Sequence, residues 1–249
     1  ASSGPRQETW ARGQLGRRQQ ARARRRLSAA AAAGPAADAE LADLVGAGAE
    51  ALGMALDPGR VSGLVGYLRL VERWNATYNL TSVRDPRAMV VQHVLDCLAA
   101  AAALRRRRRA ANCRRVLDVG SGAGLPGLVF AIALPESQVI CIDTVGKKTA
   151  FITQAVAALG LRNASARHGR VERLDGRDFD VIASRAFAPL PAFVASTRHL
   201  LADNGEWLAM KGKRPDAEIA ALTDVTVQVE PLQVPGLDAE RCIVWLCRK

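Results

Sequence analysis

The residues best suited to chemistry form a glycine-rich turn. Four glycines lie within the eight residues from Gly120 to Gly127, directly after a strand predicted at Val116–Val119. Glycine permits positive φ angles and lets a ligand approach backbone N–H groups closely, and a helix start favours a negative group. Because open α/β sheets bind ligands at the carboxyl ends of their strands, this turn is the candidate binding loop.

Two acidic residues bear on the identity of the ligand. The spacing Gly122-x-Gly124-x-x-Gly127 matches the dinucleotide fingerprint, so a nicotinamide or flavin cofactor stays open. Asp118, near the end of the first strand, would repel a pyrophosphate and would suit the cationic sulfonium and ammonium groups of S-adenosylmethionine. Asp143 ends the next strand, where an acid can accept hydrogen bonds from the ribose of either cofactor. The first acid therefore favours S-adenosylmethionine.

Missing motifs narrow the chemistry of a methyl acceptor. Methylation of a pyrimidine carbon needs a cysteine nucleophile beside a proline, and none of the five cysteines has that neighbour. Methylation of an adenine amine commonly uses Asn/Asp-Pro-Pro-aromatic, whereas residues 184–189 read Ser-Arg-Ala-Phe-Ala-Pro. A ring nitrogen such as guanine N7 loses no proton, so positioning supplies most of the rate and no catalytic base is expected. Arg185 could contact a phosphate and Phe187 could stack on a base, although a lone aromatic more often packs in a core.

Hydrophobic periodicity predicts a helical unit followed by an α/β region. Apolar residues recur at helical spacing over Leu41–Leu52, Val61–Tyr78 and Met89–Leu98, and Asp57-Pro58 and Asp85-Pro86 have the form of an N-cap followed by proline. Later helices are expected from about Pro126, over Phe151–Leu159 and after Pro191. Strands are expected at Val116–Val119, Val139–Ile142, Ala164–Arg167, Phe179–Ala183, Glu206–Met210, Val225–Val229 and Ile243–Leu246. The alternation predicts a doubly wound, mostly parallel sheet of seven strands whose last two form an antiparallel pair.

The net charge of +11 over 249 residues is concentrated in two tracts. Residues 1–28 hold eight arginines against Glu8, and Arg105–Arg109 add five more positive charges, so the remainder is near neutral. Such tracts suit phosphate attraction, or are solvated runs without a partner. We predict a disordered arginine- and alanine-rich extension over residues 1–37, a helical unit over 38–104, an arginine-rich linker over 105–115 and a methyltransferase domain over 116–249.

Composition excludes several classes of protein. With 49% hydrophobic and 24% charged residues, the chain has the usage of a soluble protein. The longest near-pure apolar stretch, Cys97–Leu104, is short of the roughly 20 residues that a membrane helix needs, and no signal peptide is visible. Five cysteines without a CxxC pair and three histidines predict neither disulfides nor a metal site, which favours a reducing cytoplasm.

Further blocks of sequence add specificity to the glycine-rich turn. They are Trp74-Asn75-x-x-Tyr78-Asn79-Leu80-Thr81, His93-Val94-Leu95-Asp96, Asp143 with Lys147-Lys148, Arg170-Val171-Glu172, Ser184-Arg185-Ala186 and Lys211-Gly212. Together with the turn, over roughly Leu64–Lys249, they resemble the bacterial 16S ribosomal RNA guanine-N7 methyltransferases of the RsmG (GidB) type. The chain departs from that family in its arginine-rich N-terminus, in Arg105–Arg109, and in Cys97 where serine is common.

The resemblance implies a class I, Rossmann-like S-adenosylmethionine-dependent methyltransferase fold. It also implies methylation at guanine 527 (usual bacterial numbering) in the 530 loop of 16S rRNA in the small ribosomal subunit, with no metal and no membrane partner. By matching positions it implies cofactor contacts at Gly120, Leu125, Val171, Glu172 and Arg185. With the turn and the two acids, the candidate cofactor-binding set is Asp118, Gly120, Gly122, Gly124, Leu125, Asp143, Val171, Glu172 and Arg185. The candidate RNA contacts are Lys147, Lys148, Arg185, Phe187 and Lys211.

The remaining polar residues are expected to be structural. Asn79, His93 and Asp96 are expected to hydrogen-bond the helical unit to the α/β domain, because this chemistry needs no base. His168 and His199 are expected to be surface residues without a role. Two other functions stay open from the residues alone, a nicotinamide- or flavin-linked Rossmann oxidoreductase and a noncatalytic RNA-binding protein.

Overall fold

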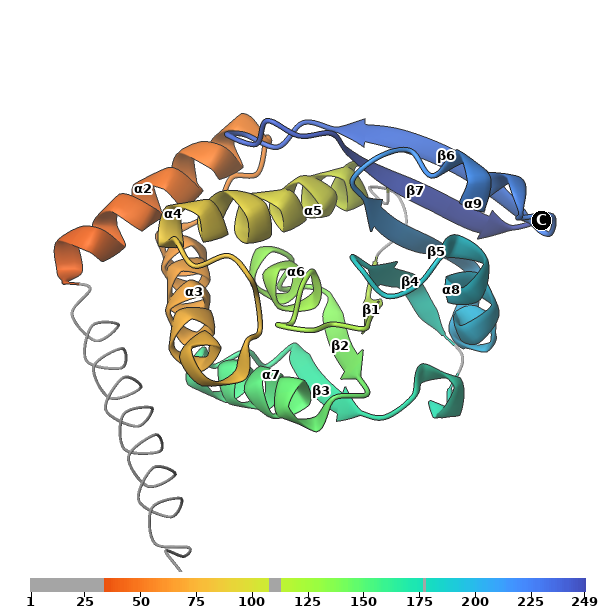
Figure 1. The fold of residues 1–249 in the computed structure, drawn as a ribbon, viewed down its shortest axis with the longest axis horizontal. Helices are drawn as coiled ribbons and strands as arrows, with labels where there is room; N and C mark the ends of the chain where they lie inside the picture. The colour runs from red at the N-terminus through yellow and green to blue at the C-terminus, as the bar shows by residue number, and fades with distance from the viewer. Residues whose placement is uncertain (1–33, 108–112, 177) are drawn as a thin grey trace, which may run out of the picture.

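The computed structural model describes residues 34–107, 113–176 and 178–249 (Figure 1). Most of the predicted N-terminal extension, up to residue 33, lies outside the described residues, as do residues 108–112 of the predicted linker. The described chain forms a helical unit followed by a sheet with helices on both of its faces.

The helical unit contains two helices and one long composite helix. Helices α2 (Pro35–Ala51) and α3 (Pro58–Tyr78) come first. The composite helix consists of α4 (Pro86–Met89), a π-helical turn η1 (Val90–Leu95) and α5 (Asp96–Arg107). Both predicted N-caps are confirmed, because the side chain of Asp57 accepts from the Arg60 N–H at 2.9 Å and that of Asp85 from the Ala88 N–H at 2.7 Å.

The helices extend beyond the predicted boundaries at both ends of the unit. Helix α2 begins at Pro35, inside the segment expected to be disordered, because proline is well suited to the first position of a helix. Helix α5 runs through Arg107, so the first three residues of the expected linker are helical, while its last residue, Arg115, begins strand β1. The Arg107 guanidinium accounts for the helical residues: its Nε lies 2.7 Å from Glu206 Oε1, and it stacks over the Trp245 ring at 4.7 Å.

A seven-stranded sheet has the order β3-β2-β1-β4-β5-β7-β6. The strands are β1 Arg115–Val119, β2 Gln138–Asp143, β3 Ala164–His168, β4 Phe179–Ser184, β5 Leu201–Lys211, β6 Val225–Leu232 and β7 Arg241–Arg248. Strands β1 to β5 are parallel, whereas β7 runs antiparallel between β5 and β6. The predicted strand count and the antiparallel final pair are confirmed.

Helices cover both faces of the sheet, and alternation along the strands divides the core accordingly. Helices α6 (Gly127–Ala133) and α7 (Gly146–Ala158) pack with the helical unit against one face. The other face is covered by α8 (Leu190–Thr197), with the 3₁₀ turns Val171–Arg173 and Arg198–Leu200 and the short helix α9 (Asp216–Ala220) nearby. Along β1, Val116 therefore faces the α6 side, while Leu117 and Val119 face the α8 side.

The composite helix Pro86–Arg107 is long and apolar enough to cross a membrane by length and composition, with a mean hydropathy of 1.4. Polar residues such as Gln92, His93 and Asp96 interrupt its apolar sequence, so its longest uninterrupted apolar stretch is short. In the fold, 78% of the apolar window is buried inside the protein, so packing in the core accounts for its composition.

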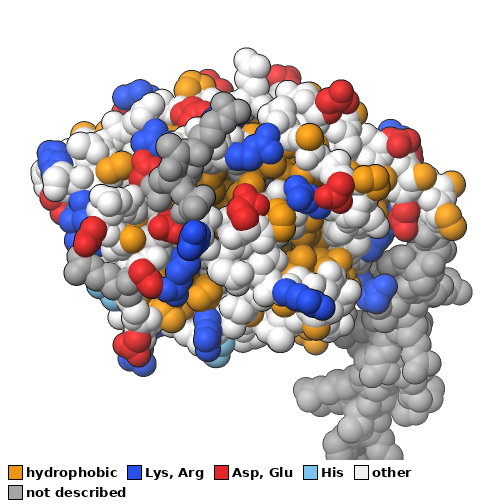
Figure 2. All heavy atoms as spheres, turned by 180° about the vertical axis from the view of Figure 1, so that it is seen from behind, with side chains coloured by type: hydrophobic (Ala, Val, Ile, Leu, Met, Phe, Trp, Pro, Cys, Tyr) orange, Lys and Arg blue, Asp and Glu red, His pale blue; other side chains and the backbone are white. Residues whose placement is uncertain are grey.

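The surface seen from behind the view of Figure 1 is chemically mixed. Acidic and basic side chains are interspersed across this face, and hydrophobic side chains are visible between them (Figure 2). This mixture agrees with the near-neutral charge expected for the body of the chain outside its two arginine tracts.

Candidate functional site: a donor pocket and an acceptor pocket

A cavity of about 400 Å³, which we call the donor pocket, opens at the carboxyl ends of β1 and β2. It is lined by Val119, Gly120, Ile142, Asp143, Thr144, Val145, Lys148, Gly169, Arg170, Val171, Glu172, Ala186 and Phe187. Four candidate cofactor residues, Gly120, Asp143, Val171 and Glu172, thus meet in one cavity. Two candidate RNA contacts, Lys148 and Phe187, line the same cavity.

Gly120 gives the donor pocket its shape. Its φ is +68°, and a Cβ at this position would lie 2.9 Å from Cδ2 of Phe187. The ring of Phe187 makes an edge contact with Phe193 at 6.2 Å and remains 36% exposed. Core packing, which we expected to be the commoner fate of Phe187, is therefore wrong: the ring forms a wall of the pocket.

Asp143 is held firmly at the base of the pocket and is 6% exposed. Its Oδ2 accepts a hydrogen bond from the Gly122 N–H at 2.9 Å, and its Oδ1 accepts one from the Val145 N–H at 2.8 Å. Lys148 Nζ lies 3.7 Å from Oδ2. Because a carboxylate has about four acceptor sites, it can still accept hydroxyl groups from a ligand in the pocket.

Three candidates from the glycine-rich turn support the pocket from outside its lining. Gly122 anchors Asp143, while the N–H groups of Gly124 and Leu125 donate to the Ser121 carbonyl at 2.7 and 2.9 Å. The Tyr67 hydroxyl, from α3, donates to the Ala123 carbonyl at 2.7 Å and is fully buried. The helical unit thus fastens the turn directly.

Asp118 lies elsewhere than we expected. It is 0% exposed and points to the α6 side of the sheet, where its Oδ2 accepts from the Gly127 N–H at 2.9 Å. Burial raises its pKa to about 7. The structure therefore contradicts the expectation that its carboxylate faces a cationic ligand. The physical reason is the two-residue period of a strand, which places Asp118 on the face opposite Leu117 and Val119.

A second cavity of about 470 Å³, the acceptor pocket, adjoins the donor pocket. It is lined by Thr81, Ser82, Val83, Gln92, His93, Asp96, Arg185, Ala186, Met210, Lys211, Gly212 and Arg241. Ala186 lines both cavities, and its neighbours Arg185 and Phe187 line one each. Arg185, for which the resemblance implied a cofactor contact, lies on the acceptor side of this boundary.

A buried carboxylate organises the arginines of the acceptor pocket. Asp96 is 3% exposed; its Oδ1 lies 3.2 Å from Arg241 Nε and its Oδ2 lies 3.6 Å from Arg185 NH1. Burial raises the pKa of Asp96, and the two guanidinium groups oppose that shift. Arg185 also donates to the Gln92 carbonyl at 3.1 Å. Asp96 therefore joins α5 to the segment that follows β4 and to β7, as we predicted.

His93 connects the same network to the loop after α3. Its Nε2 lies 2.8 Å from Thr81 Oγ1, and its Nδ1 lies 3.5 Å from Arg185 NH1. Burial and the adjacent Arg185 lower the pKa of His93 to about 4, so the ring is neutral near pH 7. The linking role predicted for His93 is confirmed. Asn79 differs, because it ends α3 and accepts a hydrogen bond from Arg84 at 3.1 Å within the helical unit.

The remaining candidate lysines differ in position. Lys211 lines the acceptor pocket and pairs with Glu218 at 2.9 Å. Lys147, on α7, is exposed and lines neither pocket.

The other two histidines lie at the surface and hydrogen-bond to backbone carbonyls. His168 donates to the Thr144 carbonyl at 3.1 Å, and His199 donates to that of Leu174 at 3.3 Å.

Sequence reasoning missed Arg241 and gave Thr81 no role. Arg241 starts β7, whose neighbour Cys242 pairs with Lys211 at the end of β5. Because β7 is antiparallel, its first residues lie at the carboxyl edge of the parallel strands. The predicted antiparallel pair was therefore a signal that could have placed Arg241 beside the site.

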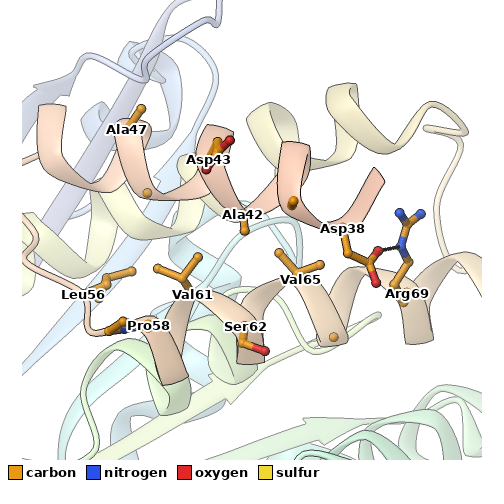
Figure 3. Close-up of a pocket in the computed structure, with 13 residues that line it drawn as sticks. Asp38, Ala42, Asp43, Ala47, Leu56, Pro58, Val61, Ser62, Val65 and Arg69 are labelled. Carbon is orange, nitrogen blue, oxygen red and sulfur yellow. Dashed lines mark hydrogen bonds and ion pairs between the residues drawn. The ribbon is translucent and has the colours of Figure 1, made fainter. Parts of the chain in front are cut away.

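A cavity of about 670 Å³ lies apart from both pockets, between α2 and α3 (Figure 3). Figure 3 shows aliphatic side chains such as Val61 and Val65 facing it, with Asp38 paired to Arg69 at one end. None of the candidate cofactor-binding or RNA-contacting residues lines it.

Comparison with known proteins identifies the family. Residues 60–244 match the family described as GidB, rRNA small subunit methyltransferase G. A ribosomal RNA small subunit methyltransferase G of Acidovorax sp. (strain JS42) is 55% identical over 208 residues, covering 80% of this chain and 92% of that protein. One from Leptothrix cholodnii is 52% identical over 206 residues, covering 82% and 94%.

Among solved structures, a SAM-dependent methyltransferase from Aquifex aeolicus aligns with a TM-score of 0.49 and 14% identity, covering 68% of this chain and 96% of that one. The family match extends over both pockets from Thr81 to Arg241. The chain belongs to the rRNA small subunit methyltransferase G family.

Proposed function

We propose that this chain transfers a methyl group from S-adenosylmethionine to N7 of guanine 527, in the 530 loop of 16S rRNA, acting on small ribosomal subunits in the cytoplasm. The observation that carries the proposal is the adjacency of the two pockets, which share Ala186. A donor in one cavity and a base in the other would meet at the segment that follows β4.

The donor pocket has features that fit S-adenosylmethionine. The Asp143 carboxylate is nearly buried and keeps acceptor sites for ribose hydroxyl groups. Gly120 presents a backbone without a side chain, in space that a Cβ would fill against Phe187. Val171 supplies an apolar wall and Glu172 a carboxylate beside it. When bound, S-adenosylmethionine supplies an electrophilic methyl group.

The acceptor pocket offers positioning groups for an RNA base. Asp96 neutralises part of the charge of Arg185 and Arg241 and holds both guanidinium groups at the pocket wall. Arginine suits contacts with phosphates and with base edges, and Phe187 at the boundary can stack on a base. Lys148 and Lys211 add positive charge at the two cavities, one in each.

The chemistry requires little beyond this positioning. Guanine N7 carries a lone pair and no proton, so no residue of the chain has to act as a general base. The neutral His93 ring lies between Thr81 and Arg185 and orients them. We assign His93 and Asp96 to positioning, not to proton transfer.

The proposal is tested by mapping N7-methylguanine in 16S rRNA. A strain lacking the gene would be complemented with the wild-type chain, with Asp143→Ala or with Asp43→Ala, and the modified guanine located by chemical cleavage. Asp43 is an exposed acid on α2, remote from both pockets, and serves as the matched control. We expect cleavage at guanine 527 with the wild type and the control, and strong loss with Asp143→Ala.

Calorimetry on the same proteins tests which cofactor the donor pocket binds. We expect the wild type to bind S-adenosylmethionine and not NAD, and Asp143→Ala to lose that binding. Restored methylation at a different nucleotide would overturn the assignment of the target. Tight binding of NAD would overturn the assignment of the donor.

A further inference from the structure

A third cavity, of about 620 Å³, adjoins the donor pocket on the side of β3. It shares Ile142, Thr144, Gly169 and Arg170 with the donor pocket and extends toward Arg173. Strand β3 is the edge strand of the sheet, and its final residue, His168, is in register with Asp143 at the end of β2. This β3 cavity therefore opens at the same edge of the sheet as the donor pocket.

The charge lining the β3 cavity has one sign. Its ionisable lining residues are Arg167, His168, Arg170 and Arg173, and no carboxylate is among the described residues that line it. Glu172, between two of these arginines in sequence, lines the donor pocket instead. No Phe, Tyr or Trp of the described chain lines this cavity, so it offers no stacking surface for a base.

The three arginines also differ in their pairing from those of the acceptor pocket. Arg185 and Arg241 share Asp96, whereas Arg167, Arg170 and Arg173 are exposed and form no ion pair with the described part of the chain. Arg170 and Arg173 flank a 3₁₀ turn in which the Arg173 N–H donates to the Arg170 carbonyl at 3.1 Å. Both arginines line the β3 cavity.

This arrangement is unfavourable without an anion and well suited to one. Cations gathered around a cavity repel one another, and a bound anion would relieve that repulsion. The planar guanidinium fork matches the geometry of phosphate oxygens. The His168 ring donates through Nε2 to the Thr144 carbonyl, which fixes it at the cavity wall.

We propose that the β3 cavity binds a phosphodiester group of the RNA strand that carries the target nucleotide, through Arg167 and Arg173. This inference rests on the proposed function, since it gives the RNA substrate a second contact site, next to the donor pocket. The target base would enter the acceptor pocket on one side of the donor, and the backbone of the same RNA would be held on the other.

The test compares two double variants that lose the same charge. Arg167→Gln with Arg173→Gln removes two cations from the β3 cavity. Arg114→Gln with Arg162→Gln is the control, because both residues are exposed and lie before the first residues of β1 and β3, at the opposite edge of the sheet. The measurement is kcat/KM for unmethylated small subunits over a series of KCl concentrations, together with KM for S-adenosylmethionine.

We expect the first pair to reduce the slope of log kcat/KM against log salt by about 0.7, since one phosphate contact to a single strand contributes roughly that much. KM for S-adenosylmethionine should not change, and the control pair should keep the wild-type slope. Equal slopes in both pairs would overturn the proposal. Binding of inorganic phosphate that is lost in the first pair, with an unchanged salt slope, would assign the cavity to a free anion and also overturn it. Failure of the wild type to methylate would instead refute the proposed function.

Discussion

Gly120 shows how much a single side-chain atom matters at the donor pocket. Its φ of +68° and the 2.9 Å that would separate an added Cβ from Phe187 leave no room for alanine. We predict that Gly120→Ala weakens binding of S-adenosylmethionine by at least about tenfold, which corresponds to about 1.4 kcal/mol, because Phe187 must move into the cavity. Calorimetry on the folded variant measures the change.

Gly160 provides the matched control for this substitution. It has a similar φ of +63°, but nothing lies within 4 Å of a Cβ placed there. Gly160→Ala therefore costs about 1–2 kcal/mol of backbone strain without touching the pocket. If both variants weakened the donor equally, backbone strain and not the Phe187 contact would be responsible.

Asp118 gives a prediction on stability and pH. Burial raises its pKa to about 7, while one of its oxygens, Oδ1, has no partner among the described residues. An acid whose folded pKa is raised contributes stability that is fully present below its unfolded pKa and is lost as pH rises through the folded value. The contribution of Asp118 should therefore fall between about pH 4 and pH 7, by roughly 2 to 4 kcal/mol.

The contribution of His93 to the free energy of unfolding changes with pH in the opposite direction, over much of the same pH range. Its pKa is lowered to about 4, so its contribution is present above about pH 6.5 and is lost as pH falls toward 4. We predict that Asp118→Asn, which removes the falling contribution, leaves a free energy of unfolding that rises between pH 4 and pH 6.5. Denaturant titration at several pH values measures this, and a variant with the wild-type profile would show that Asp118 is ionised at little cost.

At the scale of elements, α3 connects the two pockets. Tyr67 holds the glycine-rich turn through the Ala123 carbonyl, and two turns later the Asn75 side chain accepts from the Thr81 N–H at 3.0 Å. Burial raises the pKa of Tyr67 well above its ordinary value, so its hydroxyl keeps the proton that it donates. One helix thus sets both a donor-side and an acceptor-side backbone segment.

We predict that Tyr67→Phe raises KM for S-adenosylmethionine several-fold while kcat at saturating donor is retained. The ring still packs beside Phe151, but the Ala123 carbonyl loses its partner, at a cost of about 1–3 kcal/mol. Tyr78→Phe, on the same helix and 39% exposed, is the control and should match the wild type. If Tyr67→Phe lowered stability but left KM for S-adenosylmethionine unchanged, Tyr67 would contribute to packing only.

The helices and strands were largely predictable from the sequence. The side of an element on which a given residue lies was less predictable. The local signal Asp57-Pro58 identified a helix start correctly, and the glycine-rich turn lies where its Gly120 lines the donor pocket. The side on which Asp118 lies follows from the strand period, but we judged it from its proximity to the glycines alone. Arg241 lay beyond local reasoning because its place depends on pairing between β7 and β5. The helical state of Arg107 depends likewise on tertiary contacts, with Glu206 and Trp245.

At the scale of the whole molecule, the helical unit and the sheet share one hydrophobic core, and Asp96 joins them at the acceptor pocket. Residues 1–33, in contrast, precede α2 and carry eight arginines against one glutamate. Their charge suits attraction to RNA phosphates over a distance that salt screens.

We predict that deletion of residues 1–33 leaves kcat largely intact and flattens the salt dependence of kcat/KM for small subunits. The cut should stop at residue 33, because removal through residue 37 would take away Gly34 and the first turn of α2. Steady-state kinetics at several KCl concentrations measure both quantities. Loss of kcat at saturating subunits would place the extension in the catalytic machinery.

The π-helical turn Val90–Leu95 limits how this protein can vary in length. It accommodates one residue more than a regular helical turn, just before Asp96 and the buried stretch Cys97–Leu104. Loss of that one residue would convert the turn to regular α-helix, and the residues after it would keep their faces. Loss of a second residue would rotate Asp96 and everything after it by about 100° relative to the residues before the turn. Asp96 would then leave its two arginines, and the apolar stretch would turn toward water. The turn therefore tolerates the loss of one residue and no more.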